Sequence, residues 1–201
     1  MVLFNRKVNG HSINPGVDLA GVSLDGANLK RADLTSVNFA GADLTRANLT
    51  GANLTNTDLT KAHLPDAHLT GADLTGADLT RADLTGANLT RVNLTNANMT
   101  NAHLADACLR DGSLSGAFLS GANLTGVDLS GANLTDADLS YADLTGANLT
   151  DADLSYADLT LAYLTTAVLS GASLSGANLT RTDLTGSDLS NTDLTRVDLK
   201  H

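Results

Sequence analysis

Residues 71–90 read GADLTGADLTRADLTGANLT, four copies of a five-residue phrase that runs through almost the whole chain. Every fifth residue from position 19 to position 199 is apolar. This gives 37 central positions, of which 35 are Leu and the other two are Phe39 and Met99. Two places before the central residue stands Ala in 26 repeats, and Asp or Asn mostly lies between them. A period this short and regular is typical of a solenoid.

The repeat predicts extended triplets separated by corners. In an extended chain, residues two apart face the same side, so Ala and Leu point inward and Asp or Asn points outward. A continuous strand is excluded because five is odd, and a helix is excluded because a step of five residues spreads Leu around its surface. The Thr or Ser after Leu, followed most often by Gly, suits a type II turn. Thirteen corners lack Gly, Asn and Asp, and there we expect another turn type or strain.

Residues 42–45 (ADLT), 72–76 (ADLTG) and 147–150 (ANLT) resemble the pentapeptide repeat family, and the resemblance covers residues 17–201. It implies an all-β fold, a right-handed quadrilateral β-helix with four repeats in each 20-residue coil and therefore about nine coils. Spacing alone leaves a three-sided coil open. The regular array looks like the loop-free bacterial members that are abundant in cyanobacteria.

The chain is expected to form one β-helix over residues 17–201, with residues 1–16 as a cap on its first coil. A second hypothesis is a composite of two repeat units joined near residue 99, because residues 99–118 are irregular and the halves differ in charge. Residues 1–100 hold 9 Asp and 8 basic residues, and residues 101–201 hold 13 Asp and 4 basic residues. Drift within one array is the alternative. No cap is recognised after the last repeat, so Leu194 and Leu199 are expected to support end-to-end self-association.

The composition is acidic, with a net charge of −10, and all 22 acidic residues are Asp. No basic residue lies between Arg110 and Arg181, which disfavours direct binding of nucleic acid. Four Asp of one predicted column are expected to form an acidic face, serving solubility or mimicry of DNA: Asp58, Asp78, Asp138 and Asp158. One Cys, no signal peptide and no apolar run of membrane length predict a cytoplasmic protein without membrane contact.

No combination of residues points to catalysis or to a cofactor. Every Ser lies on the outside of a convex rod, the glycines are corners rather than a phosphate-binding loop, and the full core leaves no ligand cavity. His63, Asp83 and His103 share one column, and His and carboxylate are metal ligands. A flat ladder cannot direct four ligands to one point, however, so we predict a solvated polar column and no metal site.

Exposed apolar side chains grouped on a polar surface often mark contacts with another protein. The candidate residues are Tyr141, Leu161, Tyr163, Tyr156 and Phe118. Scattered apolar residues without a role are the alternative. The expected function is a non-enzymatic structural or protein-interaction scaffold whose partner the sequence does not name. The alternative is an acidic DNA mimic that binds a topoisomerase such as DNA gyrase, as some pentapeptide repeat proteins do. Gyrase-directed relatives typically carry a C-terminal dimerisation helix and protruding loops, and residues 17–201 show neither.

Overall fold

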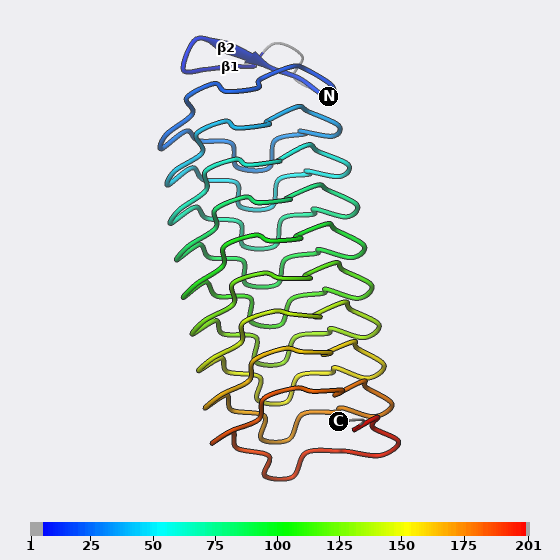
Figure 1. Cartoon of the computed structure of the whole chain (residues 1–201). Coiled ribbons are helices and arrows are strands. Elements are labelled where there is room, and N and C mark those ends of the chain that lie inside the picture. Colours follow the sequence, from blue (N-terminus) through cyan, green and yellow to red (C-terminus); the bar gives the residue numbers. More distant parts are fainter. Residues whose placement is uncertain (1–5, 200–201) are drawn as a thin grey trace.

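The computed structural model describes residues 6–199, and the chain winds there into a stack of similar coils (Figure 1). A short antiparallel hairpin lies at one end of the stack, formed by β1 (Arg6–Val8) and β2 (His11–Ile13). Asn9 and Gly10 connect the strands with φ of 50° and 85°, the two positive values of a type I′ turn. Ile13 is buried against the core. The segment predicted as a cap thus contains a hairpin; residues 1–5 of that segment lie outside the described part.

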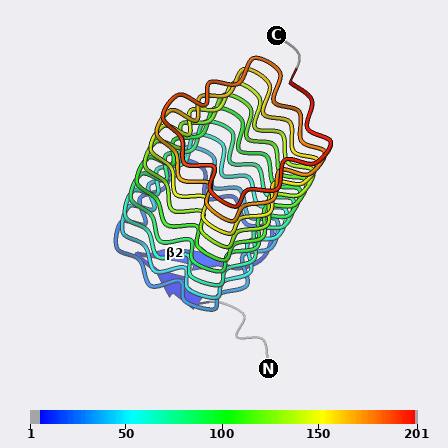
Figure 2. The same cartoon turned by 90° about the horizontal axis from the view of Figure 1, so that it is seen from below.

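Parallel bridges join each outward residue to the residue 20 positions later, from Asp18↔Asn38 to Asn178↔Asp198. The bonds alternate in direction along the ladder: the Leu44 N–H donates to the His63 carbonyl (N···O 2.6 Å), and the His63 N–H donates to the Ala42 carbonyl (2.9 Å). A coil therefore contains four pentapeptides, which excludes the three-sided alternative. Figure 2 shows the coils in register along the stack.

Each coil has four faces, which we number by their outward residues. Face 1 carries residues 18, 38 and so on to 198, face 2 residues 23 to 183, face 3 residues 28 to 188 and face 4 residues 33 to 193. The corner between faces 1 and 2 is called corner 1/2, and the others are named in the same way. Side chains in one column follow one another at the spacing of adjacent strands, about 4.8 Å.

Every described corner from residue 21 to residue 196 has its second turn residue at positive φ, whatever its side chain. Gly26 has φ of 62° and Arg31 has φ of 55°. The expectation of another turn type at corners without Gly, Asn or Asp is wrong, and the strain that was the other expectation agrees with bulky side chains at positive φ. His201, the thirteenth of these corners, lies outside the described residues. The stack supplies a reason, because each corner N–H from residue 21 to residue 176 donates to a carbonyl of the next coil, as Arg31 does to Thr50 (3.0 Å). Tertiary hydrogen bonds thus override the local preference.

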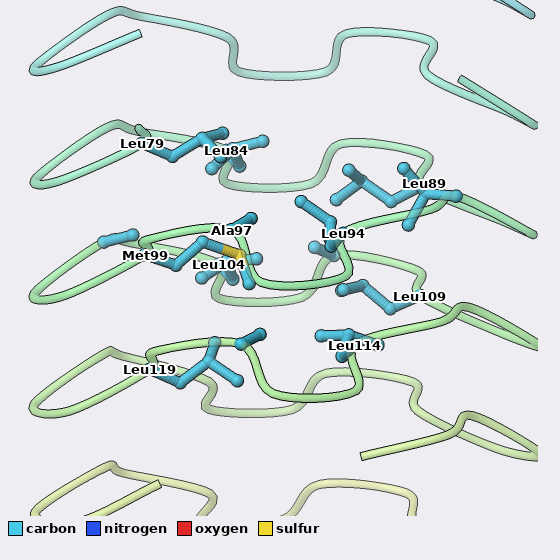
Figure 3. Packing of buried hydrophobic residues seen from close by; sticks show 14 of the residues in the cluster. Leu79, Leu84, Leu89, Leu94, Ala97, Met99, Leu104, Leu109, Leu114 and Leu119 are labelled. Carbon is cyan, nitrogen blue, oxygen red and sulfur yellow. The ribbon is translucent and has the colours of Figure 1, made fainter. Parts of the chain in front are cut away.

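The core is a column of Leu and Ala, as the inward positions of the repeat predict. Figure 3 shows Leu79, Met99 and Leu119 one above another, with Leu84 and Leu104 beside them. All five are fully buried. Thr57, which occupies an Ala position, is buried as well, and its hydroxyl donates to the Leu54 carbonyl at 2.6 Å. No buried side-chain polar atom among residues 6–199 lacks a hydrogen-bond partner. The same residues contain no helix of the length and apolarity that crossing a membrane requires.

Candidate interaction surface

The outward Asp and Asn side chains accept hydrogen bonds from the residue two positions later in the chain. In Asp78, Oδ1 accepts hydrogen bonds from the Thr80 N–H (2.9 Å) and the Thr80 hydroxyl (2.6 Å). Asn98 receives the same pair of bonds from Thr100. This local motif explains why Asp or Asn stands two places before Thr or Ser throughout the repeat. A carboxylate on this surface is therefore held in one orientation before any partner arrives.

Hydrogen-bond donors in this motif lower the pKa of several carboxyl groups. The Thr185 hydroxyl, followed by the Thr185 N–H, holds the pKa of Asp183 below its ordinary value. The Ser190 hydroxyl and N–H lower the pKa of Asp188 in the same way. Asp43 and Asp153 show the same shift, caused first by the hydroxyls of Thr45 and Ser155. These groups stay ionised at neutral pH and preserve the acidic character of the rod.

The four predicted members of the acidic face all lie on face 1, but in two separate pairs. Asp58 bridges Asp78, and Asp138 bridges Asp158. Asn98 and Phe118 stand between the pairs. Each of the four carboxylates accepts the N–H two residues later, at 2.9–3.0 Å. The acidic column is thus interrupted where the apolar Phe118 emerges.

The column of His63, Asp83 and His103 forms on face 2 as predicted, one residue in each successive coil. The three side chains belong to a flat ladder. Within residues 6–199, no group of three or more His, Cys or Asp side chains comes close enough to hold a metal ion.

Three of the five predicted interaction residues come together at corner 1/2. The Tyr141 N–H donates to the Thr160 carbonyl (2.9 Å), so Leu161 occupies the same corner in the next coil. Tyr163 follows on face 2, directly after Asp143 in its column. Tyr141 and Tyr163 are exposed, and Leu161 is partly buried. We call Tyr141, Leu161 and Tyr163 the corner ridge.

The other two predicted residues lie apart from the corner ridge. Tyr156 occupies corner 4/1, on the far side of face 1, and its ring lies over Gly176, where a Cβ would come within 2.7 Å of the ring carbons. Phe118 projects from face 1 beside Asn98 and Asp138 and is half exposed. Leu194 and Leu199, the predicted end-to-end contact, are exposed in the last described coil.

The sequence analysis did not predict a regular contact between a corner Asn or Asp and the corner glycine of the next coil. Seven of the eight corner Asn and Asp residues that have a corner 20 positions later are followed there by Gly. The structure supplies the reason: a Cβ on Gly86 would lie 2.7 Å from Oδ1 of Asp66, and one on Gly116 would lie 2.5 Å from Oδ1 of Asn96. The side-chain oxygen needs the space that glycine leaves. The 20-residue spacing of Asn or Asp and Gly is the signal that could have revealed this contact.

A shallow open groove at corner 3/4 also went unpredicted. Asp111 and Asp151 flank Gly131 there, and Arg110 lies beside them. The Arg110 Nε donates to the Ser130 hydroxyl at 3.2 Å and lies 3.6 Å from a carboxylate oxygen of Asp128. The remaining lining residues are Asn148 and Thr150. Only the stacking of coils brings these residues, which are up to 41 positions apart, to one groove.

Comparison with known proteins gives a consistent result. A family model described as pentapeptide repeats matches residues 16–51, 47–86, 77–116, 87–126, 109–140, 128–165 and 162–200. No curated protein sequence matches significantly. Among solved structures, HetL, a pentapeptide repeat protein involved in heterocyst differentiation regulation from the cyanobacterium Nostoc sp. strain PCC 7120, is 35% identical. The match covers 91% of this chain and 89% of HetL, with a TM-score of 0.64.

Full-length QnrB1, a plasmid-mediated fluoroquinolone resistance protein, is 20% identical, with a TM-score of 0.69. The match covers 89% of this chain and 92% of QnrB1, and at this identity it shows a shared fold alone.

Proposed function

The chain belongs to the pentapeptide repeat family, whose members fold as right-handed quadrilateral β-helices, and on that premise we propose that it is a non-enzymatic scaffold. In this proposal a rod of about nine coils presents its side faces to another protein. Proteins of this family are generally structural or interaction proteins. The similarity to HetL, a protein involved in a regulatory process, supports a role exercised through a partner.

The observation that carries the proposal is the contrast between a uniform core and a chemically varied surface. Leu and Ala fill the interior, and the chemically varied residues stand on convex faces and corners. Grouped exposed aromatic residues on such a surface are typical of contact sites. The corner ridge is the place where three apolar side chains adjoin, so we propose it as the main contact, with Phe118 and Tyr156 outside it.

The test is affinity purification of the full chain from its native cell after mild crosslinking, followed by reconstitution of any enriched protein with the purified rod. We expect a partner that forms a stoichiometric complex and is not chemically altered. If no protein is enriched over beads without bait, or if the reconstituted partner is converted to a product, the scaffold proposal is wrong.

A second candidate function is supported by the charge of the rod and by the fold that it shares with QnrB1. A solenoid with a net charge of −10 carries negative groups at regular spacing, as duplex DNA does. We propose, as the alternative, that the rod occupies the DNA-binding surface of a topoisomerase such as DNA gyrase. A supercoiling assay with purified gyrase separates the candidates: the DNA mimic requires inhibition that is relieved by excess DNA, and the scaffold requires none.

Two further properties belong to the proposal. A single Cys, Cys108, and an acidic surface fit a cytoplasmic protein. Exposed Leu194 and Leu199 offer a contact for self-association. Light scattering over a range of concentrations tests the second point, with Leu194→Asn as the comparison. A wild-type chain that stays monomeric at the highest concentration contradicts it.

A further inference from the structure

We propose that the corner ridge docks a protein partner that presents arginine or lysine side chains around an apolar depression. The inference rests on the proposed scaffold function and adds the surface and the chemistry of the partner. The surface consists of the corner ridge (Tyr141, Leu161 and Tyr163) and of the carboxylates along its two sides, Asp138, Asp143 and Asp158.

The apolar part of this surface spans two successive coils. Tyr141 and Leu161 follow each other on corner 1/2, and Tyr163 lies two residues beyond Leu161 on face 2. Tyr141 is 60% exposed and Tyr163 is 54% exposed. The side chains therefore project from a convex edge, a shape that fits a depression in a partner rather than a small molecule, which binds in a concave pocket.

Carboxylates border the corner ridge on both sides. Asp138 and Asp158 lie on face 1, and Asp143 lies on face 2, one coil before Tyr163. Oδ1 of each accepts the backbone N–H two residues later, at 2.9–3.0 Å. The side chains are thereby fixed in position, and Oδ2 of each takes no hydrogen bond from residues 6–199. The nearest basic side chain in the corner column is Arg181, one coil beyond Leu161.

The chain gives up local stability at all three ridge positions. Tyr163 replaces the Asp or Asn that accepts a backbone N–H elsewhere, as Asp143 does from Thr145 at 3.0 Å. Tyr141 and Leu161 adopt φ of 59°, a conformation in which glycine is unstrained and a bulky side chain is disfavoured. Every described corner without Gly shares this positive φ, so the feature particular to this place is that two bulky corner side chains adjoin a bulky residue on the neighbouring face.

The combination of rings and fixed carboxylates selects a cation-bearing partner. A guanidinium group stacks on a tyrosine ring and pairs with a carboxylate at the same time. An acidic protein or a nucleic acid meets repulsion from the same carboxylates. Apolar side chains of the partner find their contact on Leu161. Arginine or lysine residues around an apolar depression therefore match each element of the surface.

Tyr156 supplies a matched control within the same chain. It is a corner tyrosine with φ of 61° and 61% exposure, very close to the values of Tyr141. Its ring, however, lies over Gly176 on the other side of face 1. Asn is tolerated at positive φ, so Tyr141→Asn and Tyr156→Asn remove the same side chain from the same backbone conformation.

The experiment is a titration of the isotope-labelled full chain with the peptide acetyl-Arg-Leu-Arg-Leu-Arg-amide at low salt, followed by amide NMR. We expect shifts concentrated in residues 138–143 and 158–163, which carry the corner ridge and its carboxylates. We also expect an affinity about two- to fivefold weaker in Tyr141→Asn, the effect of losing one exposed cation–π contact. Tyr156→Asn is expected to bind as the wild type does, and the Glu-Leu-Glu-Leu-Glu counterpart is expected to cause no shift. Shifts spread over the Asp residues of all faces, or equal weakening by both variants, would overturn the inference.

Affinity purification with three baits, the wild-type chain, Tyr141→Asn and Tyr156→Asn, separates this inference from the scaffold function. If the wild-type rod and Tyr156→Asn enrich one partner that Tyr141→Asn loses, and that partner carries a basic-edged apolar depression, both ideas stand. If all three baits enrich the partner equally, the docking surface is wrong and the scaffold function survives. If no bait enriches a protein, the scaffold function itself fails.

Discussion

Replacing Gly126 with Ala tests the contact between a corner side chain and the glycine of the next coil. A Cβ on Gly126 would lie 2.6 Å from Oδ1 of Asp106 and 3.7 Å from its Cγ. Gly146 occupies the same corner one coil later, with φ of 68° against 65° for Gly126. A Cβ on Gly146 would meet only the Thr166 hydroxyl, at 3.9 Å. The two glycines differ in the neighbouring carboxylate and share everything else that matters for the substitution.

The expected magnitude has two parts. Placing Ala at positive φ costs about 1–2 kcal/mol, and the smaller entropy of the unfolded chain returns about 0.5–1 kcal/mol. This part applies to both variants. In Gly126→Ala, the Asp106 side chain must also leave its rotamer, which costs about 0.5–1.5 kcal/mol. We therefore expect Gly126→Ala to lower the free energy of unfolding by about 1–2.5 kcal/mol, and Gly146→Ala by about 0.5–1 kcal/mol.

The assay is urea unfolding followed by far-UV circular dichroism, completed by a double-mutant cycle with Asp106→Gly. The second substitution removes the carboxylate and keeps the backbone conformation, so it should cancel the additional cost. The coupling free energy between the two sites should be about 0.5–1.5 kcal/mol. Equal destabilisation by the two Gly→Ala variants, together with additive effects in the cycle, would refute the reasoning.

Three other predictions concern the core, the corners and pH. Leu94→Ala removes a fully buried side chain and should lower the free energy of unfolding by about 3–5 kcal/mol, measured by the same urea assay. Thr166 has a β-branched side chain at φ of 58°, a strained conformation for it. Thr166→Gly should therefore raise the free energy of unfolding by about 0.5–1 kcal/mol and raise the urea midpoint with it. A lower midpoint would contradict backbone strain at this corner. Carboxyl groups with a folded-state pKa below the ordinary 3.8 stabilise the fold above that pH, and their contribution is lost as the pH falls through 3.8 towards the folded value. The urea midpoint should therefore drop in this acidic window, and less so when the donor is removed by Thr185→Ala; an unchanged midpoint in wild type would count against the role of the hydroxyl donors.

The sequence predicts the coil and its core well because the period acts on every residue alike. Alternation within the triplet places Ala72 and Leu74 inside, and both are buried. The conformation of the corners was predicted less well. Leu161 and Arg31 have no local preference for positive φ, and the stack imposes it through hydrogen bonds that their N–H groups donate to carbonyls of the next coil.

For the surface, the sequence predicts which residues share a column but not how their side chains are oriented. A spacing of 20 residues predicts that Tyr141 and Leu161 share one corner in successive coils, and the backbone bond from Tyr141 to Thr160 places them there. It does not tell whether a side chain turns along its column, as Tyr156 does towards Gly176. It also does not show that the carboxylate of Asp138 is engaged with Ser140. Rotamers and local hydrogen bonds decide these points, and they follow from atomic geometry rather than from the period.

The 20-residue ladder has a consequence for how fast the chain can fold. All-β proteins usually fold slowly because their strands pair over long separations in sequence. Here each bridge joins residues 20 apart, so the loop closed at every step is short and the same from Asp18 to Asp198. The relative contact order is about 0.1, in the range of helical bundles. Once one pair of coils has formed, each added coil repeats the same closure, and the rod can lengthen without a rising entropic barrier.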